Sequence, residues 1–126
     1  MPLAAAIPAQ SLAHWRTLIK DGRASIADHF FANHRAITVL RQHAQLVDGV
    51  LREIWRDGEM PATAALIAVG GYGRGLLFPH SDVDLLLLLP EHLSTPIQTQ
   101  LERFVGLTWD IGLDIGHAVR TEQECI

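Results

Sequence analysis

Two aspartates, Asp82 and Asp84, open an apolar segment and are separated by one residue. Because side chains on a strand alternate between its faces, both carboxylates are expected on the same side. Like charges placed together repel and raise each other's pKa unless a cation lies between them. Hard divalent cations such as magnesium prefer oxygen ligands of this kind. An isolated pair of aspartates more often marks a solvated strand end. The surrounding sequence therefore has to distinguish a metal site from such a strand end.

A glycine cluster, Gly70 to Gly75, lies upstream and directly follows a short apolar run over 64–69. Backbone without side chains can approach an anion closely and offer several N–H groups to phosphate oxygens, and Arg74 is the cation of this loop. The spacing lacks the third glycine of a dinucleotide fingerprint, where Leu76 stands. It also lacks the lysine of a Walker loop, because the single lysine of the chain is Lys20.

The glycine loop and the aspartate pair predict more in combination than either motif does alone. A phosphate cradle followed by a two-carboxylate metal site is expected for binding a nucleoside triphosphate. Such a site calls for a third carboxylate from a neighbouring strand, which completes a two-metal cluster and holds or deprotonates the attacking hydroxyl. Asp114 fits, because it shares a strand face with Gly116 and Ala118, and an acid at that place in a plain core would be costly. Asp110 is expected at a helix end with a surface role.

The apolar spacing predicts the elements that position these residues. Two helices are expected in the first half, one stopped by Asp21-Gly22 and one long helix that ends at Asp57-Gly58. Buried strands follow on both sides of the glycine loop, and a further helix leads to a third strand. The ranges are Ser11 to Lys20 and Ser25 to Ile54 for the first helices, 64–69 and 83–89 for the strands, Glu91 to about Asp110 for the helix and Leu113 to Val119 for the last strand.

This order of elements predicts a mixed α/β (α+β) class. A helical N-terminal extension over residues 1–60 is expected to pack on a core over residues 61–126. Thr121 to Glu124 has the spacing of a capping box, which marks the start of a helix. The chain ends two residues later, so we expect the core to be truncated at its C-terminus.

Composition excludes several classes of function. The 126 residues are 48% apolar and 19% charged, which suits one globular domain. A net charge of −4 argues against binding to nucleic acid or anionic membranes. The single cysteine, Cys125, excludes a disulfide framework within the chain. The start of the chain lacks the basic region of a signal peptide, and the longest apolar run is far shorter than the roughly 20 residues of a membrane helix. We therefore expect a soluble cytoplasmic protein.

The pattern of Gly70-Gly71, then Ser81-Asp82-Val83-Asp84-Leu85, then an acid on a later strand resembles the DNA polymerase β nucleotidyltransferase superfamily. The longer segments Ala68 to Gly75, Pro79 to Asp84 and Trp109 to Thr121 closely resemble the PII-protein uridylyltransferase family. The resemblance covers roughly Ala64 to Thr121, and the helical first half agrees with the family only loosely.

The resemblance implies a polymerase-β-like core with a mixed sheet. It implies transfer of UMP from UTP to a tyrosine of the PII nitrogen-regulatory protein, with release of pyrophosphate. Two magnesium ions are implied as cofactors, with manganese as an alternative. The catalytic and metal-binding residues that it implies are Asp82, Asp84 and Asp114, and the nucleotide-binding residues are Gly70, Gly71, Arg74 and Ser81. The family also implies an HD-type hydrolase domain and ACT domains beyond this chain.

The sequence departs from the family pattern at two positions, and two alternatives to uridylyl transfer stay open. Asp114 stands where glutamate is expected about as often, and Ala118 stands where the family usually has serine. The three acids do not encode the base, so another nucleotide or acceptor is an alternative, as is a regulatory module that binds nucleotide without transfer. His80 and His117 flank the acids, and each could meet phosphate or a carboxylate; their roles stay open.

Overall fold

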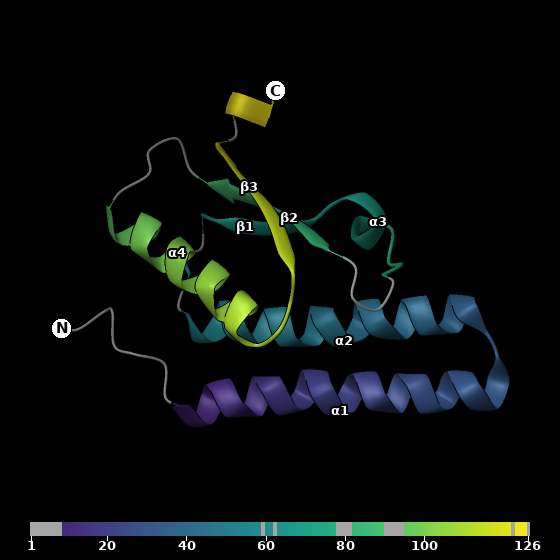
Figure 1. Cartoon of the computed structure of the whole chain (residues 1–126). Coiled ribbons are helices and arrows are strands. Elements are labelled where there is room, and N and C mark those ends of the chain that lie inside the picture. The colour runs from purple at the N-terminus through teal and green to yellow at the C-terminus, as the bar shows by residue number, and fades with distance from the viewer. Residues whose placement is uncertain are drawn as a thin grey trace.

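The computed structural model describes residues 9–58, 60–61, 63–77, 82–89, 95–121 and 123–125. Helices dominate the first half and strands the second (Figure 1). The elements are, in chain order, α1 (Ala9–Asn33), α2 (Ala36–Asp57), β1 (Ala65–Ala68), α3 (Gly70–Gly73), β2 (Val83–Leu89), α4 (Thr95–Asp110), β3 (Ile115–Thr121) and the 3-10 turn η1 (Gln123–Cys125).

The sheet has three strands in the order β1-β2-β3. β1 runs antiparallel to β2, with Ala68 opposite Leu85, and β3 runs parallel to β2, with Val83 opposite Ile115. A parallel neighbour needs a long crossover, and α4 provides it. The predicted class is confirmed: a mixed sheet of the polymerase-β type is preceded by a helical extension.

Alternate residues of β2 point to the two faces of the sheet. Val83, Leu85, Leu87 and Leu89 are buried on the face against which α2 and α4 pack, whereas Asp84 is exposed on the other. The prediction of a buried strand thus holds for one face of β2 and is wrong for β1. In β1 only one residue of four is even half-buried, because this strand pairs with β2 alone in the described part of the chain.

The predicted helix boundaries of the first half are also wrong. The helix does not stop at Asp21-Gly22, and the expected long helix is broken at His34 and Arg35, where the chain turns back. His34 takes a left-handed conformation with φ of 54°, and its N–H donates to the Phe30 carbonyl over 2.6 Å, a common helix C-terminal arrangement. Gly22 lies within α1, and its missing side chain makes room for α2, since a Cβ there would lie 2.6 Å from Cδ1 of Leu46.

The core joins the helices to the sheet in one cluster. α1 lies against the side of α2 that faces away from the sheet (Figure 1). It contributes Trp15 and Ile19, which are 1% and 2% exposed. Trp55 of α2 packs edge-on against Phe104 of α4, with ring centroids 5.3 Å apart, so both helices that cover the sheet also contact each other.

The predicted capping box is present. The Thr121 N–H donates to Glu124 Oε1 over 2.9 Å, and the Glu124 N–H donates back to Thr121 Oγ1 over 3.3 Å. Hydrogen bonding of the Glu124 carboxylate, first by the Thr121 backbone and then by its side chain, lowers the pKa of Glu124. The two bonds of the capping box begin η1. No described helix is both long enough and apolar enough to span a membrane.

Candidate functional site

The structure places the three predicted acids on one face of the sheet, at neighbouring strand ends. Asp82 directly precedes β2, Asp84 is its second residue, and Asp114 directly precedes β3. The Val83 N–H donates to the Asp114 carbonyl over 2.7 Å. Since Val83 is opposite Ile115, the same register places Asp82 beside Asp114. All three aspartates are exposed, as expected for groups that face a ligand rather than the core.

Two glycines flank the Asp84 carboxylate. Gly116 is opposite Asp84 in the parallel pair, and a Cβ built there would lie 2.8 Å from Oδ1 of Asp84. A Cβ on Gly70, whose φ is 62°, would lie 3.2 Å from Oδ2. Any side chain at either place would crowd the carboxylate. The sequence predicted Gly116 on this face, but the function of its missing side chain appears only once the strand register is known.

The glycine cluster was expected to be a loop, but it begins with one helical turn, α3. The Gly73 amide donates to the Val69 carbonyl, and the amides of Arg74, Gly75 and Leu76 donate to carbonyls within the cluster. The amides that open a helical turn have no partner within it, which leaves those of Gly70, Gly71 and Tyr72 as the candidates for an anion. The Val69 N–H donates to the Asp84 carbonyl over 3.0 Å, so the loop starts directly beside the acid. Arg74 is exposed at the end of α3.

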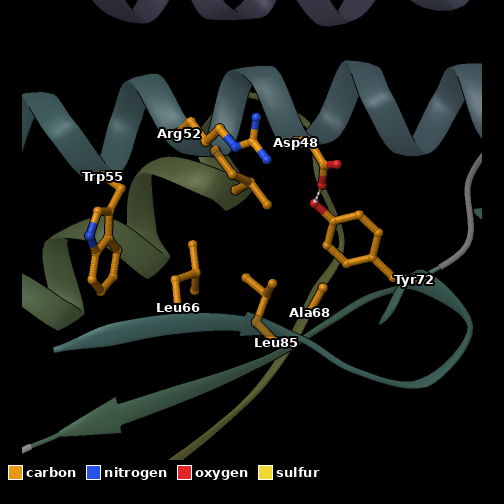
Figure 2. A pocket seen from close by; sticks show the side chains of 8 residues that line it. Asp48, Arg52, Trp55, Leu66, Ala68, Tyr72 and Leu85 are labelled. Atoms are coloured by element: carbon orange, nitrogen blue, oxygen red, sulfur yellow. Dashed lines mark hydrogen bonds between the residues drawn. The ribbon is translucent and has the colours of Figure 1, made fainter. Parts of the chain in front are cut away.

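Tyr72 and Asp48 are residues that sequence reasoning missed. Tyr72 lies among the glycines, yet its ring is buried, and its hydroxyl donates a hydrogen bond to Oδ1 of Asp48 on α2 (Figure 2). Burial, and then the bond to Asp48, raise the pKa of Tyr72 well above its usual value. The only signal in the sequence was a large aromatic residue within a cluster of glycines.

Arginines of α1 contact the turn that leads to Asp114. Arg16 Nε donates to the Asp110 carbonyl over 2.9 Å, and Arg23 Nη1 lies 3.5 Å from the Gly112 carbonyl. Arg23 Nε also donates to His43 Nε2 on α2 over 3.2 Å. Partial burial lowers the pKa of Arg23, while the charge of Asp114 opposes that change. The helical extension therefore supports the chain just before the third acid. Asp110 itself is exposed at the end of α4, as expected.

His117 does not join the acids. It is opposite Leu85, and it lines a cavity of about 530 Å³ between the sheet and α4, together with Leu87, Leu101 and Val105. It thus lies on the face opposite to Asp84, away from the three acids. Ser81 and His80 lie outside the described residues.

The donor set of this face suits a divalent cation. Carboxylate oxygens are the ligands that magnesium and manganese prefer, and the space beside the Asp84 carboxylate exists because Gly70 and Gly116 have no side chains. Among the described residues, no three acidic, histidine or cysteine side chains already converge as a metal cluster. The acids share a face and a sheet edge, and their side chains would have to turn toward a common ion.

Comparison with known proteins identifies the family of this chain. The model of the nucleotidyltransferase domain family matches residues 49–124, so the chain belongs to that family. The chain is 49% identical over 116 residues to the bifunctional uridylyltransferase/uridylyl-removing enzyme of Nitrosospira multiformis, covering 87% of the chain and 13% of that enzyme. It is 50% identical over 123 residues to the enzyme of the same name from Ralstonia nicotianae, covering 98% of the chain and 14% of that enzyme.

The chain thus spans about one seventh of the length of these curated relatives. No solved structure matches it.

Proposed function

We propose that this chain carries the site for transfer of UMP from UTP to a tyrosine of the PII regulatory protein, with release of pyrophosphate. The observation that carries the proposal is the Asp84 carboxylate, which lies between Gly70 of the glycine loop and Gly116 of β3. The printed name of the relatives, uridylyltransferase, supports uridine as the base. A phosphate-binding loop and a carboxylate site in direct contact are what a reaction at a triphosphate requires.

In the proposed reaction the tyrosine oxygen forms a bond to the α-phosphorus of UTP as the bond to the β-phosphate oxygen breaks. The backbone amides of Gly70 and Gly71, with Arg74 and Ser81, orient the triphosphate so that the two bonds lie in line. Asp114 accepts the proton of the tyrosine hydroxyl. Two divalent cations, magnesium or manganese, held by Asp82, Asp84 and Asp114, would supply the positive charge that neutralises the leaving pyrophosphate.

Calorimetric titration of UTP and of ATP into the chain, with and without magnesium, tests this proposal. We expect magnesium-dependent binding that favours UTP. It should be lost in the Asp82→Asn/Asp84→Asn double variant, because neutral amides then replace the charged carboxylates that hold the cations. Asp110→Asn is the matched control: it removes an exposed carboxylate from the end of α4 and is expected to bind as the natural chain does.

Binding that survives in the double variant would contradict the assignment of the acids. Preference for ATP would keep the nucleotidyltransferase site but replace uridylyl transfer by adenylyl transfer. Addition of PII protein and labelled UTP then tests the acceptor, with radiolabel on its tyrosine as the expected product.

A further inference from the structure

The glycine loop is attached to α2 at two described places. At its far end the Leu77 N–H donates to the Leu40 carbonyl over 3.1 Å. At its start the Tyr72 hydroxyl donates to Asp48, two helical turns further along α2. The two bonds join Tyr72 within the loop and Leu77 just after it to one helix, on the side of the sheet opposite to the acids.

The packing of the Tyr72 ring is incomplete on one side. A cavity of about 410 Å³ lies beside the ring, between α2 and the sheet, and is lined by Arg52, Leu66 and Leu85 among others (Figure 2). Atoms that line such a space have no packing partners on that side. The hydrogen bond between Tyr72 and Asp48 adds a directional restraint there, and a carboxylate acceptor makes it stronger than a bond between neutral groups.

The loop in turn determines what Asp84 meets. Gly70 to Gly75 contains only two residues with side chains beyond hydrogen, Tyr72 and the exposed Arg74. A shift of the buried Tyr72 would move the whole helical turn α3. Gly70, the residue of this turn that lies next to Oδ2 of Asp84, would move with it. The distance between the loop amides and the carboxylates must match the length of a triphosphate held by cations.

We propose that Asp48 and Tyr72 are positioning residues of the nucleotide site: their hydrogen bond sets the placement of the glycine loop relative to the Asp84 carboxylate. The proposal rests on the proposed function, because it concerns the same nucleotide. Asp48 contacts no substrate in this scheme, and it acts through Tyr72 alone.

The test is the dissociation constant of magnesium-UTP for Tyr72→Phe, Asp48→Ala and Asp48→Asn. Loss of one hydrogen bond is expected to weaken binding about three- to tenfold in Tyr72→Phe and Asp48→Ala. Asp48→Asn keeps an oxygen acceptor for the hydroxyl and is expected to restore most of the affinity. Asp57→Ala, at the exposed end of the same helix, is the matched control and should bind as the natural chain does.

A second measurement needs no nucleotide. Tyr72 is the only tyrosine of the chain, so the phenolate absorbance during an alkaline titration reports on it alone. We expect phenolate to form at a higher pH than the value of about 10 for free tyrosine, and at a lower pH in Asp48→Ala than in the natural chain. Melting temperatures show that each variant is folded.

The outcomes separate the two proposals. Unchanged UTP affinity in both Tyr72→Phe and Asp48→Ala, beside clear binding by the natural chain, overturns the positioning role and leaves the proposed function intact. Phenolate formation at the same pH with and without Asp48 also overturns it. A folded natural chain that binds no magnesium-UTP overturns the proposed function and the positioning role together, before any variant is compared.

Discussion

At the scale of single residues, Asp84 is the acid that lies between two glycines. Its two carboxylate oxygens face backbone without side chains, at Gly116 on one side and Gly70 on the other. The absence of side chains at these two places is as much a part of the site as the carboxylate, because it leaves the space in which a cation and a phosphate could lie.

Replacement of Gly116 by alanine tests this. The new Cβ would lie 2.8 Å from Oδ1 of Asp84, so the carboxylate has to turn away. Because the φ of Gly116 is not positive, alanine suits the backbone there and the chain should stay folded. We expect the affinity for magnesium-UTP to fall about tenfold, a change of about 1.4 kcal/mol, with little change in melting temperature.

Gly106→Ala is the matched control. Gly106 is an exposed position of α4 where a Cβ meets nothing within 4 Å. This variant should bind as the natural chain does and be more stable by about 0.5–1 kcal/mol, because alanine favours the helix. Equal UTP affinity in the two alanine variants would show that Gly116 is not needed beside Asp84.

Sequence reasoning predicted the strand positions of the three aspartates but not the residues that support the glycine loop. Strand alternation is a local rule, and it correctly put Asp82 and Asp84 on one face and Asp114 on the same face as Gly116. The contact of Tyr72 with Asp48 joins residues 24 apart, and no local pattern predicts it. The face of His117 could have been predicted, since the same alternation that exposes Gly116 turns its neighbour to the other side.

At the scale of elements, the predictions were good for strands and poor for helix ends. β2 has the predicted bounds, because an apolar run after two acids has few alternatives. The two long helices were divided in the wrong place, because the same apolar spacing continues through both and Asp21-Gly22 looks like a stop signal. Gly22 instead serves the close approach of α1 and α2 at Leu46, a tertiary contact that helix propensity does not contain.

Gly22→Val is expected to destabilise the chain by about 1–3 kcal/mol. The added side chain has to displace Leu46, whose Cδ1 would lie 2.6 Å from the new Cβ. The control is Gly49→Val, the same change in α2 where a Cβ meets nothing within 4 Å, and it should be close to neutral. Urea denaturation followed by circular dichroism measures both. Equal stabilities of the two variants would show that α1 and α2 are not closely packed at Gly22.

At the scale of the whole molecule, the helical extension and the sheet share one core. The family match begins at residue 49, within α2, yet α1 contributes buried side chains to the same cluster as β2 and α4. Arg16 and Arg23 also reach from α1 to the turn before Asp114. A boundary near residue 60 stays a prediction, and the shared core favours unfolding of both parts as one unit.

Trp15→Ala tests whether the helical extension and the sheet unfold as one unit. Trp15 is 1% exposed, and removal of a buried tryptophan costs about 3–5 kcal/mol. If the chain unfolds as one unit, magnesium-UTP binding should be lost at a correspondingly lower urea concentration, although Trp15 is on the outer helix. Trp109→Ala, at a side chain that is 52% exposed, is the control and should cost about 1 kcal/mol or less. Loss of α1 structure without loss of UTP binding would instead show two independent units.

The central position of β2 also determines how the site can open. Its backbone is hydrogen-bonded to β1 on one side and to β3 on the other, so its amides are expected to exchange with solvent deuterium only in the rarest, most complete opening events. Asp84 is on that strand, whereas the glycine loop beside it is an exposed turn with mostly local bonds. Asp84 is thus expected in the slowest-exchanging part of the molecule, whereas the loop amides, although Tyr72 is bonded to Asp48, should exchange through smaller local openings.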